Sequence, residues 1–375
     1  MLQKKSTLII QKTRQGDLYM VNNSDEKNLK AVYRFSFGPW NIDEGADPFG
    51  PPVRKPEPLA KKMKVAKQLG FDGMQFHDDD AVPELDEKSG AEIEREAKKV
   101  KKMLDNEGLV AEFVAPRLWF SPKTIDGAYT SNDPACRRYA IERTKKAIDI
   151  MNILGTHNMV LWLAREGTYI RESKNVRLAV LQIRDAINEM LAYDKDVIVL
   201  IEPKPNEPVD SAIIPTIGHA IGLSYITDDP SRVCCLVETA HSVLAGLDPA
   251  DDMAYALAHN KLRSVHLNDQ GGLKFDQDKS FGSYNLRRAF NQVRVLEEYG
   301  YGRHGEWIGL DVKTMRTQKQ AVNIKHLRNS LATFKLLVEK VRAMDKTLVS
   351  RLIADRDYEE LDRYILCNLM GIRYS

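Results

Sequence analysis

The sequence has few cysteines and no long hydrophobic run. Its four cysteines, Cys136, Cys234, Cys235 and Cys367, form no C-x-x-C pair, which argues against a zinc ribbon or a disulfide framework. We therefore expect buried free thiols in a reducing compartment. The apolar run at residues 8–10 is too short for a signal peptide, and no later run is long enough to span a bilayer. These absences predict a cytoplasmic protein that makes no use of a membrane.

The sequence also has almost no excess charge. Its 55 Lys and Arg residues nearly balance its 53 Asp and Glu residues, which gives a formal net charge of +2. This balance provides no bulk attraction to nucleic acid or to an anionic membrane. The chain has neither internal repeats nor a low-complexity linker. Its 43% hydrophobic and 29% charged residues are typical of a globular protein with a sizeable core.

Short apolar runs rich in Val, Ile and Phe alternate with longer amphipathic segments. The strand-like runs are residues 31–37, 72–76, 109–114, 158–162, 197–202, 233–238, 262–267 and 307–311. The helix-like segments are residues 56–69, 91–106, 134–154, 176–191, 249–259, 286–299 and 320–341. This alternation predicts parallel strands joined by helical crossovers.

Eight strand–helix units in a chain of this length predict a closed (β/α)8 TIM barrel, in the α/β class. An open doubly wound sheet is the alternative, because periodicity alone does not count strands. We expect the barrel to occupy residues 31–344, after an N-terminal extension over residues 1–30. Residues 345–375 are polar and predict a short C-terminal helical tail.

Side chains able to bind metals or move protons recur at the ends of the predicted strands. The residues at or just after these ends are His77, Trp162, Glu202, Glu238, His266 and Asp311. In a (β/α)8 barrel the C-terminal ends of the strands form the active-site face, so these side chains converge. Several carboxylates in one small volume repel each other unless a cation neutralises them. The positions therefore predict a divalent metal site.

Each of these signals is weak when it is taken alone. A Glu at a strand end is more often solvated or salt-bridged than a ligand. The short spacing of Glu238 and His241 suits one metal, but such pairs also occur by chance. Asp276 and Asp278 share one face of an extended segment, which suits a hard cation but also a turn. Their common place on one predicted rim favours the metal interpretation.

Six motifs, in this order, resemble those of the xylose isomerase family. They are Phe35-Ser36-Phe37-Gly38-Pro39-Trp40, Asp47-Pro48-Phe49-Gly50, Phe76-His77-Asp78-Asp79-Asp80, Arg165-Glu166-Gly167, Glu202-Pro203-Lys204-Pro205-Asn206-Glu207-Pro208 and Lys274-Phe275-Asp276-Gln277-Asp278. The resemblance covers residues 35–316. It implies an aldose–ketose sugar isomerase that works by a metal-assisted hydride shift, with two divalent ions (Mn, Mg or Co) per subunit. It also implies a small sugar substrate and a homo-oligomer, either a dimer or a tetramer.

The resemblance implies roles for individual residues. The matches to first-metal ligands are Glu202, Glu238 and Asp311. The matches to second-metal ligands are Glu238, which is shared, with His241, Asp276 and Asp278. Lys204 matches the lysine that hydrogen-bonds the sugar's carbonyl oxygen, and His77, oriented by Asp80, matches the pair that assists ring opening. Trp40 and Trp162 match the aromatic walls of the family's substrate site. Phe49 matches a residue that, in the family, reaches into a neighbouring subunit's site.

The sequence departs from the family at two further positions of the expected site, His266 and Trp119. Aligned without gaps, His266 falls where the family has an aspartate ligand of the first metal. Asp269 would take that role only with a gap, so we favour His266 as the ligand, with a second-layer histidine as the alternative. An imidazole favours Mn or Co over Mg. Trp119 replaces a phenylalanine of the substrate wall, so we expect an altered sugar pocket.

Two other functions stay open from the sequence. His266 resembles a ligand of sugar epimerases on this barrel, which favours a metal-dependent epimerase or lyase that acts on a sugar or sugar conjugate by proton abstraction. The other possible function is that of a sugar-binding protein that has lost its enzymatic activity. Retention of Lys204, His77 and most of the metal ligands argues against that last interpretation.

Overall fold

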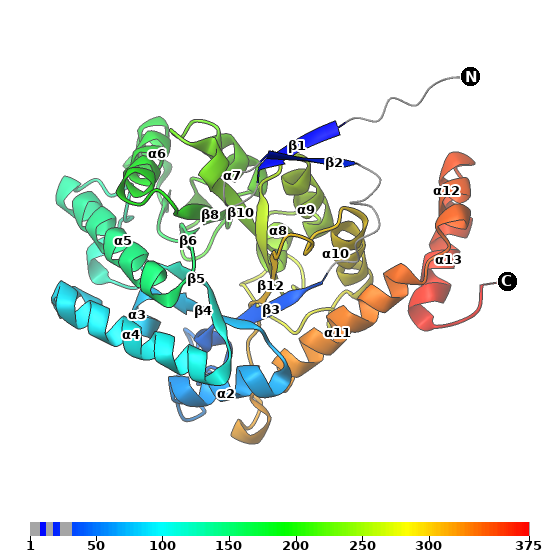
Figure 1. Ribbon diagram of the computed structural model, residues 1–375, viewed down its shortest axis with the longest axis horizontal. Coiled ribbons are helices and arrows are strands. Elements are labelled where there is room, and N and C mark those ends of the chain that lie inside the picture. The colour runs from blue at the N-terminus through cyan, green and yellow to red at the C-terminus, as the bar shows by residue number, and fades with distance from the viewer. Residues whose placement is uncertain (1–7, 13–17, 23–31, 375) are drawn as a thin grey trace.

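Eight parallel strands close into a barrel in the computed structural model, which describes residues 8–12, 18–22 and 32–374 (Figure 1). The strands are β3 (Arg34–Phe37), β4 (Gly73–His77), β5 (Val110–Ala115), β6 (Asn158–Trp162), β8 (Ile198–Glu202), β10 (Val233–Glu238), β11 (Leu262–Leu267) and β12 (Trp307–Leu310). The barrel closes where β12 pairs with β3. Six strands lie within the runs predicted from the sequence, and β4 and β5 each end one residue beyond theirs. The (β/α)8 barrel is therefore confirmed and the open sheet is wrong.

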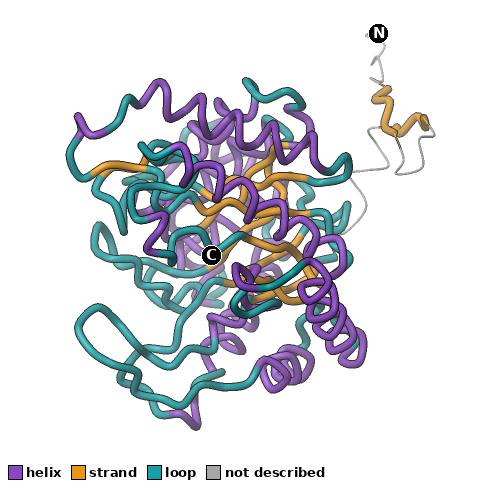
Figure 2. The backbone as a smooth tube through the Cα atoms, turned by 90° about the vertical axis from the view of Figure 1, so that its left-hand side faces the viewer, coloured by secondary structure: helices purple, strands orange, loops and turns teal. Residues whose placement is uncertain are grey.

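Helices surround the strands, as Figure 2 shows from the side. They are α2 (Leu59–Leu69), α4 (Gly90–Glu107), α5 (Pro134–Leu154), α6 (Val176–Tyr193), α7 (Ile217–Ser224), α9 (Pro249–Ala258), α10 (Leu286–Glu298) and α11 (Lys325–Arg342). Local signals define their ends: α4 begins with a capping box between Ser89 and Glu92, and α5 ends at the left-handed Gly155. The helix predicted over residues 320–341 begins later, because residues 320–322 form a separate 3-10 turn.

Short elements complete the described chain. Helices α3 (Asp78–Ala81) and α8 (Thr239–Leu244) follow β4 and β10 directly, and strands β7 (Gly167–Thr168) and β9 (Ser211–Ala212) pair beside the barrel. The 3-10 turns are η1 (Pro39–Asn41), η2 (Leu85–Glu87), η3 (Pro122–Thr124), η4 (Arg171–Ser173), η5 (Pro230–Arg232) and η6 (Gln320–Val322). The tail forms α12 (Lys346–Ala354) and α13 (Tyr358–Met370), and β1 (Leu8–Lys12) pairs antiparallel with β2 (Leu18–Asn22).

Two of the absences expected from the sequence can be compared with the structure. All four cysteines are free: Cys136 and Cys235 are buried, whereas Cys234 and Cys367 are half-buried. In the described ranges no helix combines the length and the apolar character that a bilayer crossing requires.

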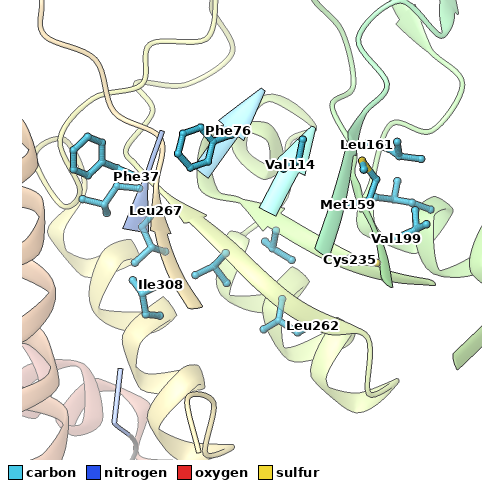
Figure 3. Close-up of a cluster of buried hydrophobic side chains, with 14 of the residues drawn as sticks. Phe37, Phe76, Val114, Met159, Leu161, Val199, Cys235, Leu262, Leu267 and Ile308 are labelled. Carbon is cyan, nitrogen blue, oxygen red and sulfur yellow. The ribbon is translucent and has the colours of Figure 1, made fainter. Parts of the chain in front are cut away.

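The core has two layers because side chains alternate along each strand. Outward-facing residues such as Phe37, Phe76 and Ile308 pack against the helices (Figure 3). A smaller inward-facing cluster fills part of the barrel interior and consists of Phe113, Ala115, Val160, Leu200 and Leu236. The candidate site lies at the mouth, beyond this apolar cluster.

Helix α11 holds two loops of the barrel mouth together. His326 Nε2 lies 2.8 Å from the carbonyl oxygen of Asn41, and its Nδ1 lies 3.1 Å from Thr314 Oγ1. The side chain of Asn41 in turn accepts a hydrogen bond of 2.7 Å from the Val312 backbone. These bonds fix the residues on either side, including Trp40 and Asp311, which face the site.

The burial of His326 predicts a specific loss of stability in acid. Burial lowers the pKa of His326 from 6.5 to about 4, so the folded protein holds it neutral. Between these values the unfolded chain binds more protons, so the free energy of unfolding falls as the pH drops through this window and is fully present above it. The pKa difference corresponds to about 3 kcal/mol.

Replacement of His326 by Gln removes this titration. Urea unfolding of both proteins at several pH values between 7.5 and 4.5 should therefore show a shallower pH dependence for the variant. Equal slopes in the two proteins would contradict the assignment.

Candidate metal centre

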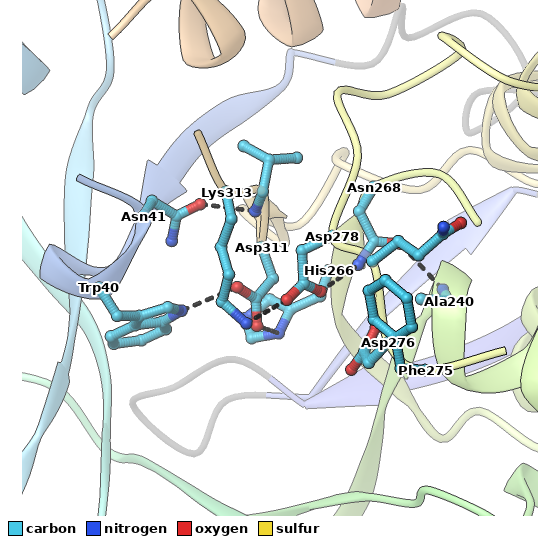
Figure 4. Close-up of polar contacts among 12 residues, drawn as sticks. Trp40, Asn41, Ala240, His266, Asn268, Phe275, Asp276, Asp278, Asp311 and Lys313 are labelled. Atoms are coloured by element: carbon cyan, nitrogen blue, oxygen red, sulfur yellow. Dashed lines mark hydrogen bonds and ion pairs between the residues drawn. The ribbon is translucent and has the colours of Figure 1, made fainter. Parts of the chain in front are cut away.

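Four predicted ligands meet at the C-terminal ends of neighbouring strands. Glu202 ends β8, Glu238 ends β10, His266 lies near the end of β11, and Asp311 follows β12. Each contributes a ligand atom, and these atoms all lie within 4.8 Å of one another. Figure 4 shows His266 and Asp311 facing the same point. We refer to these four residues as the first cluster.

The structure distinguishes His266 from Asp269 as the candidate metal ligand at the end of β11, the seventh strand of the barrel. His266 is 2% exposed, and its Nδ1 lies 3.3 Å from Glu202 Oε1 and 3.8 Å from Asp311 Oδ2. Asp269 lies in a different contact set, where it accepts bonds from the backbone of Tyr284 and Asn285 and pairs with Arg288 at 3.1 Å. The geometry therefore places the imidazole, and not Asp269, in the first cluster.

Glu238, His241 and Asp276 form a second cluster beside the first. His241 Nε2 lies 3.3 Å from both Glu238 Oε2 and Asp276 Oδ2. Glu238 belongs to both clusters, as a carboxylate shared by two cations would. Asp278 is buried next to this cluster but has other partners: Lys313 pairs with it, and Asn268 Nδ2 lies 3.2 Å from its Oδ1 (Figure 4).

Crowding raises the pKa values of three clustered groups, Glu238, Asp311 and His266. Burial, with the charge of Asp276, raises the pKa of Glu238 to about 7. Burial and the charge of Glu238 also raise the pKa of Asp311. Burial alone would lower the pKa of His266, but the charge of Glu202 outweighs it and raises the pKa well above its ordinary value. The carboxylates of the two clusters therefore carry more negative charge than the neighbouring cationic groups of the protein neutralise.

The donor atoms fit hard divalent cations. Both ring nitrogens of His266, Nδ1 of His241 and Oδ1 of Asp276 are buried and make no hydrogen bond within the described ranges. Buried polar atoms without partners are costly unless something binds them. Carboxylate oxygens with one or two imidazoles are the ligands that Mn, Co and, less readily, Mg accept. The two clusters are therefore candidate sites for two cations that share Glu238.

Lys204 lies between the second cluster and the aromatic wall. Its ammonium is 2.9 Å from Asp276 Oδ2 and 3.1 Å from Glu207 Oε2, and it lies 5.3 Å from the ring centre of Trp162. Burial would lower the pKa of Lys204, but these two carboxylates outweigh burial and raise it. The lysine is thus a fixed positive charge that faces the cavity.

Aromatic rings form a continuous wall opposite the clusters. Trp40 stacks on His77 with ring centres 4.2 Å apart, His77 meets Trp119 edge-on at 5.1 Å, and Trp119 meets Trp162 edge-on at 4.5 Å. Trp40 also donates a 2.8 Å hydrogen bond to Asp311, which links the wall to the first cluster (Figure 4). The structure therefore brings the three predicted tryptophans to one surface.

His77 has two competing partners at the same nitrogen. Its Nδ1 lies 3.0 Å from Asp80 Oδ2 and 2.5 Å from Arg117 Nη2. Burial would raise the pKa of Asp80, but the neighbouring His77 and Arg117 outweigh it and lower the pKa to about 2. Nδ1 can donate to the carboxylate or accept from the guanidinium, so this contact controls which ring nitrogen carries the proton.

The wall and the clusters enclose a cavity of about 950 Å³. At its rim, Phe49 is 95% exposed. Arg316 holds the loop that carries Phe49, because its Nη1 donates to the carbonyl oxygens of Gly45 and Pro51, both at 2.7 Å. The phenyl ring therefore projects from an anchored loop at the rim of the cavity and is almost fully exposed.

Three residues that contact this site, Asn268, Lys313 and Arg117, were not predicted from the sequence. Asn268 Nδ2 lies 2.9 Å from Glu238 Oε1 and links it to Asp278, Lys313 neutralises Asp278, and Arg117 contacts His77. Lys313 and Asn268 each stand two residues from a predicted ligand, so strand alternation offered a signal for both. Arg117 lies in a loop, where the sequence offered none.

Comparison with known proteins agrees with this geometry. The family model described as xylose isomerase-like TIM barrel matches residues 63–329. A xylose isomerase from Thermus thermophilus is 35% identical over 322 residues, which cover 84% of this chain and 81% of that protein. A 3-keto-D-glucoside 4-epimerase from E. coli has the same fold, with a TM-score of 0.58 and 15% identity over 81% of this chain and 99% of the other. A protein solved with a bound zinc atom gives a TM-score of 0.57 and 13% identity, over 83% of this chain and 100% of the other.

Proposed function

Because the chain belongs to the xylose isomerase-like TIM barrel family, we propose that it is a metal-dependent aldose–ketose isomerase. The reaction moves a hydrogen between C1 and C2 of an open-chain sugar. The observation that carries this proposal is the place of Lys204: it is a buried cation between the second cluster and the wall. An isomerase needs such a donor for the oxygen that gains negative charge.

The first cation would be held by Glu202, Glu238, His266 and Asp311, and the second by Glu238, His241 and Asp276, with Asp278 beside it. When bound, the cations supply Lewis acidity that polarises the oxygens on C1 and C2. The protein's own groups do the remaining work. Asn268 keeps Glu238 and Asp278 in register, and Lys313 balances the charge of Asp278.

Ring opening falls to His77. Its ring lies on Trp40 at the edge of the cavity, where it can exchange a proton with the ring oxygen and the anomeric hydroxyl of a cyclic sugar. Asp80 and Arg117 orient it through the same nitrogen. The indole rings of Trp119 and Trp162 then cover the apolar face of the open chain and exclude water from C1 and C2.

An epimerase or lyase that uses proton abstraction is the second candidate. The position of His266 in the first cluster favours it, since an imidazole there departs from the all-carboxylate first site of xylose isomerases. The similarity to the E. coli epimerase does not favour either reaction, because at 15% sequence identity it supports only a common fold. The 35% identity to a xylose isomerase supports the isomerase as the first choice.

A substrate panel tests the proposal. Aldoses, ketoses and sugar conjugates are each incubated with metal-free protein and with protein loaded with Mg, Mn or Co. We expect interconversion of at least one aldose–ketose pair, which stops with a chelator and returns with Mn or Co. Conversion of a ketose only into its epimer would instead support the second candidate.

The imidazole in the first cluster predicts a metal preference. We expect the wild-type protein to bind Mn or Co more tightly than Mg, since Mg prefers oxygen ligands. His266→Asp restores an all-carboxylate first cluster and should move the ratio of Mg to Mn affinity towards Mg by about tenfold or more. His219→Asp, an exposed histidine on α7, is the control and should leave the ratio unchanged. A wild-type preference for Mg, unaltered in His266→Asp, would remove His266 from the ligand set.

The exposed ring of Phe49 predicts a homo-oligomer. A large apolar side chain on a fixed loop gains most when a second copy buries it, and such anchors each contribute about 2 kcal/mol or more. Phe49→Ala should therefore raise the dissociation constant of the oligomer by about 30-fold, measured by analytical ultracentrifugation. Leu336→Ala, on the outer surface of α11, should have no such effect. A wild-type protein that is monomeric and fully active would refute this prediction.

A further inference from the structure

Strand β5 contains one residue more than its neighbour β4 over the same length. Met74 pairs with Ala111 and Phe76 with Val114, so one residue of β4, Gln75, lies opposite two residues of β5, Glu112 and Phe113. An irregularity of this kind re-aims a side chain and is frequent beside active sites. Here it turns two consecutive residues towards the barrel interior: Phe113 lines the cavity, and Glu112 is 0% exposed.

Glu112 crosslinks strands from opposite sides of the barrel. Its Oε1 accepts a hydrogen bond of 2.5 Å from Ser264 on β11, and its Oε2 accepts bonds from Ser36 on β3 and, at 3.1 Å, from Gln75 on β4. All three partners are neutral, and all three can donate. This is the environment that an acceptor-only carboxylate requires, so Glu112 places a negative charge in the barrel below the metal centre.

The same network comes close to the imidazole of the first cluster at Gly309. Ser264 precedes His266 by two residues on the same face of β11. A Cβ atom added to Gly309 on β12 would lie 2.4 Å from Gln75 Nε2 and 2.9 Å from His266 Cδ2, so both side chains occupy the space that a larger residue at this position would fill. Gln75 Oε1 and His266 Nε2 are also both buried without a hydrogen-bond partner in the described part of the chain.

We propose that Glu112 is a positioning residue for the first cluster: it anchors the Gln75 amide against the His266 ring and holds Nδ1 towards the carboxylates. The inference rests on the proposed metal site. A histidine that binds a metal through one nitrogen depends on a second layer of groups that orients its ring. An imidazole ligand supplies one negative charge fewer than a carboxylate ligand would. The carboxylate of Glu112 compensates for this difference from within the barrel.

Titration of the metal-free protein with Mn²⁺ tests this role. Glu112→Gln keeps the shape of the side chain but removes its charge, and should weaken the tighter Mn²⁺ binding step by about 10- to 100-fold. It should also shift the ¹⁵N resonances of the His266 ring in the metal-free protein. The matched control is Glu166→Gln, since Glu166 is equally buried but accepts its bonds from residues 128–130, away from both clusters. Its Mn²⁺ affinity should equal that of the wild type.

Gln75→Met provides a second, independent variant if Glu112→Gln does not fold. It removes the amide through which, in this proposal, Glu112 acts on the His266 ring, and it should weaken Mn²⁺ binding to a similar degree. A folded Glu112→Gln or Gln75→Met protein with wild-type Mn²⁺ affinity and unshifted His266 resonances would overturn the inference while leaving the metal site intact. Absence of Mn²⁺ binding in the wild type and in Glu166→Gln would overturn the proposed function, and this inference with it.

Discussion

Replacement of Glu238 by Gln is expected to abolish activity and to remove both metal sites at once. Glu238 is the residue common to the two clusters, and the amide that replaces it carries no charge. Without it the first cluster keeps two carboxylates and an imidazole, and the second keeps one carboxylate and an imidazole. Hard cations bind in proportion to the charge and number of their oxygen ligands, so both sites should weaken together.

Metal analysis and Mn²⁺ titration of the Glu238→Gln protein measure this effect directly. The control is Asp269→Asn, another buried carboxylate nearby, whose contacts are with Arg288 and the backbone of residues 284–285. That variant should retain two Mn²⁺ ions per chain. Loss of only one ion in Glu238→Gln would mean that the two sites do not share this residue, and full activity would refute the two-metal account.

Replacement of Lys204 by Met is expected to lower kcat by about 10²- to 10³-fold, the cost of removing one donor to a developing oxyanion. The methionine keeps the length of the side chain but supplies no charge and no N–H. Because Lys204 is not a ligand, and its loss frees Asp276 from a competing cation, Mn²⁺ should bind at least as tightly as in the wild type. The combination of low kcat with intact metal binding is the signature of a group that acts on the substrate.

A second buried lysine provides the control for this variant. Lys261 lies at the opposite end of the barrel, where it donates hydrogen bonds to the carbonyl oxygens of Pro230 and Val233. Lys261→Met should lower stability but leave the kcat of the folded protein unchanged. A Lys204→Met enzyme with near-normal kcat would remove this residue from the mechanism.

The barrel was predictable because its strands carry their own signal. Each is a short apolar run, and the last residues of β8 and β10, Glu202 and Glu238, interrupt that pattern where the strand reaches the mouth. Helix α7 was not predicted, because its sequence lacks a clear helical signal. Its sequence contains Gly218 and Gly222 and is apolar on most sides, so it shows no amphipathic stripe.

The site was predictable only as far as strand ends determine it. The first cluster follows from residues that end successive strands. Glu112 does not, because regular alternation along β5 gives no indication that two consecutive residues turn inward. Arg117 depends on how its loop returns to the mouth, and a single sequence does not encode that path in any local pattern.

The most direct test of the proposed isomerase follows the transferred hydrogen. The best aldose from the substrate panel, deuterated at C2, is converted by the Mn-loaded protein in ordinary water, and the ketose is examined by NMR. A hydride shift between C2 and C1 predicts that the deuterium appears at C1 of the product. Complete loss of the deuterium to solvent would contradict this account and would instead establish proton abstraction, the chemistry of the epimerase alternative.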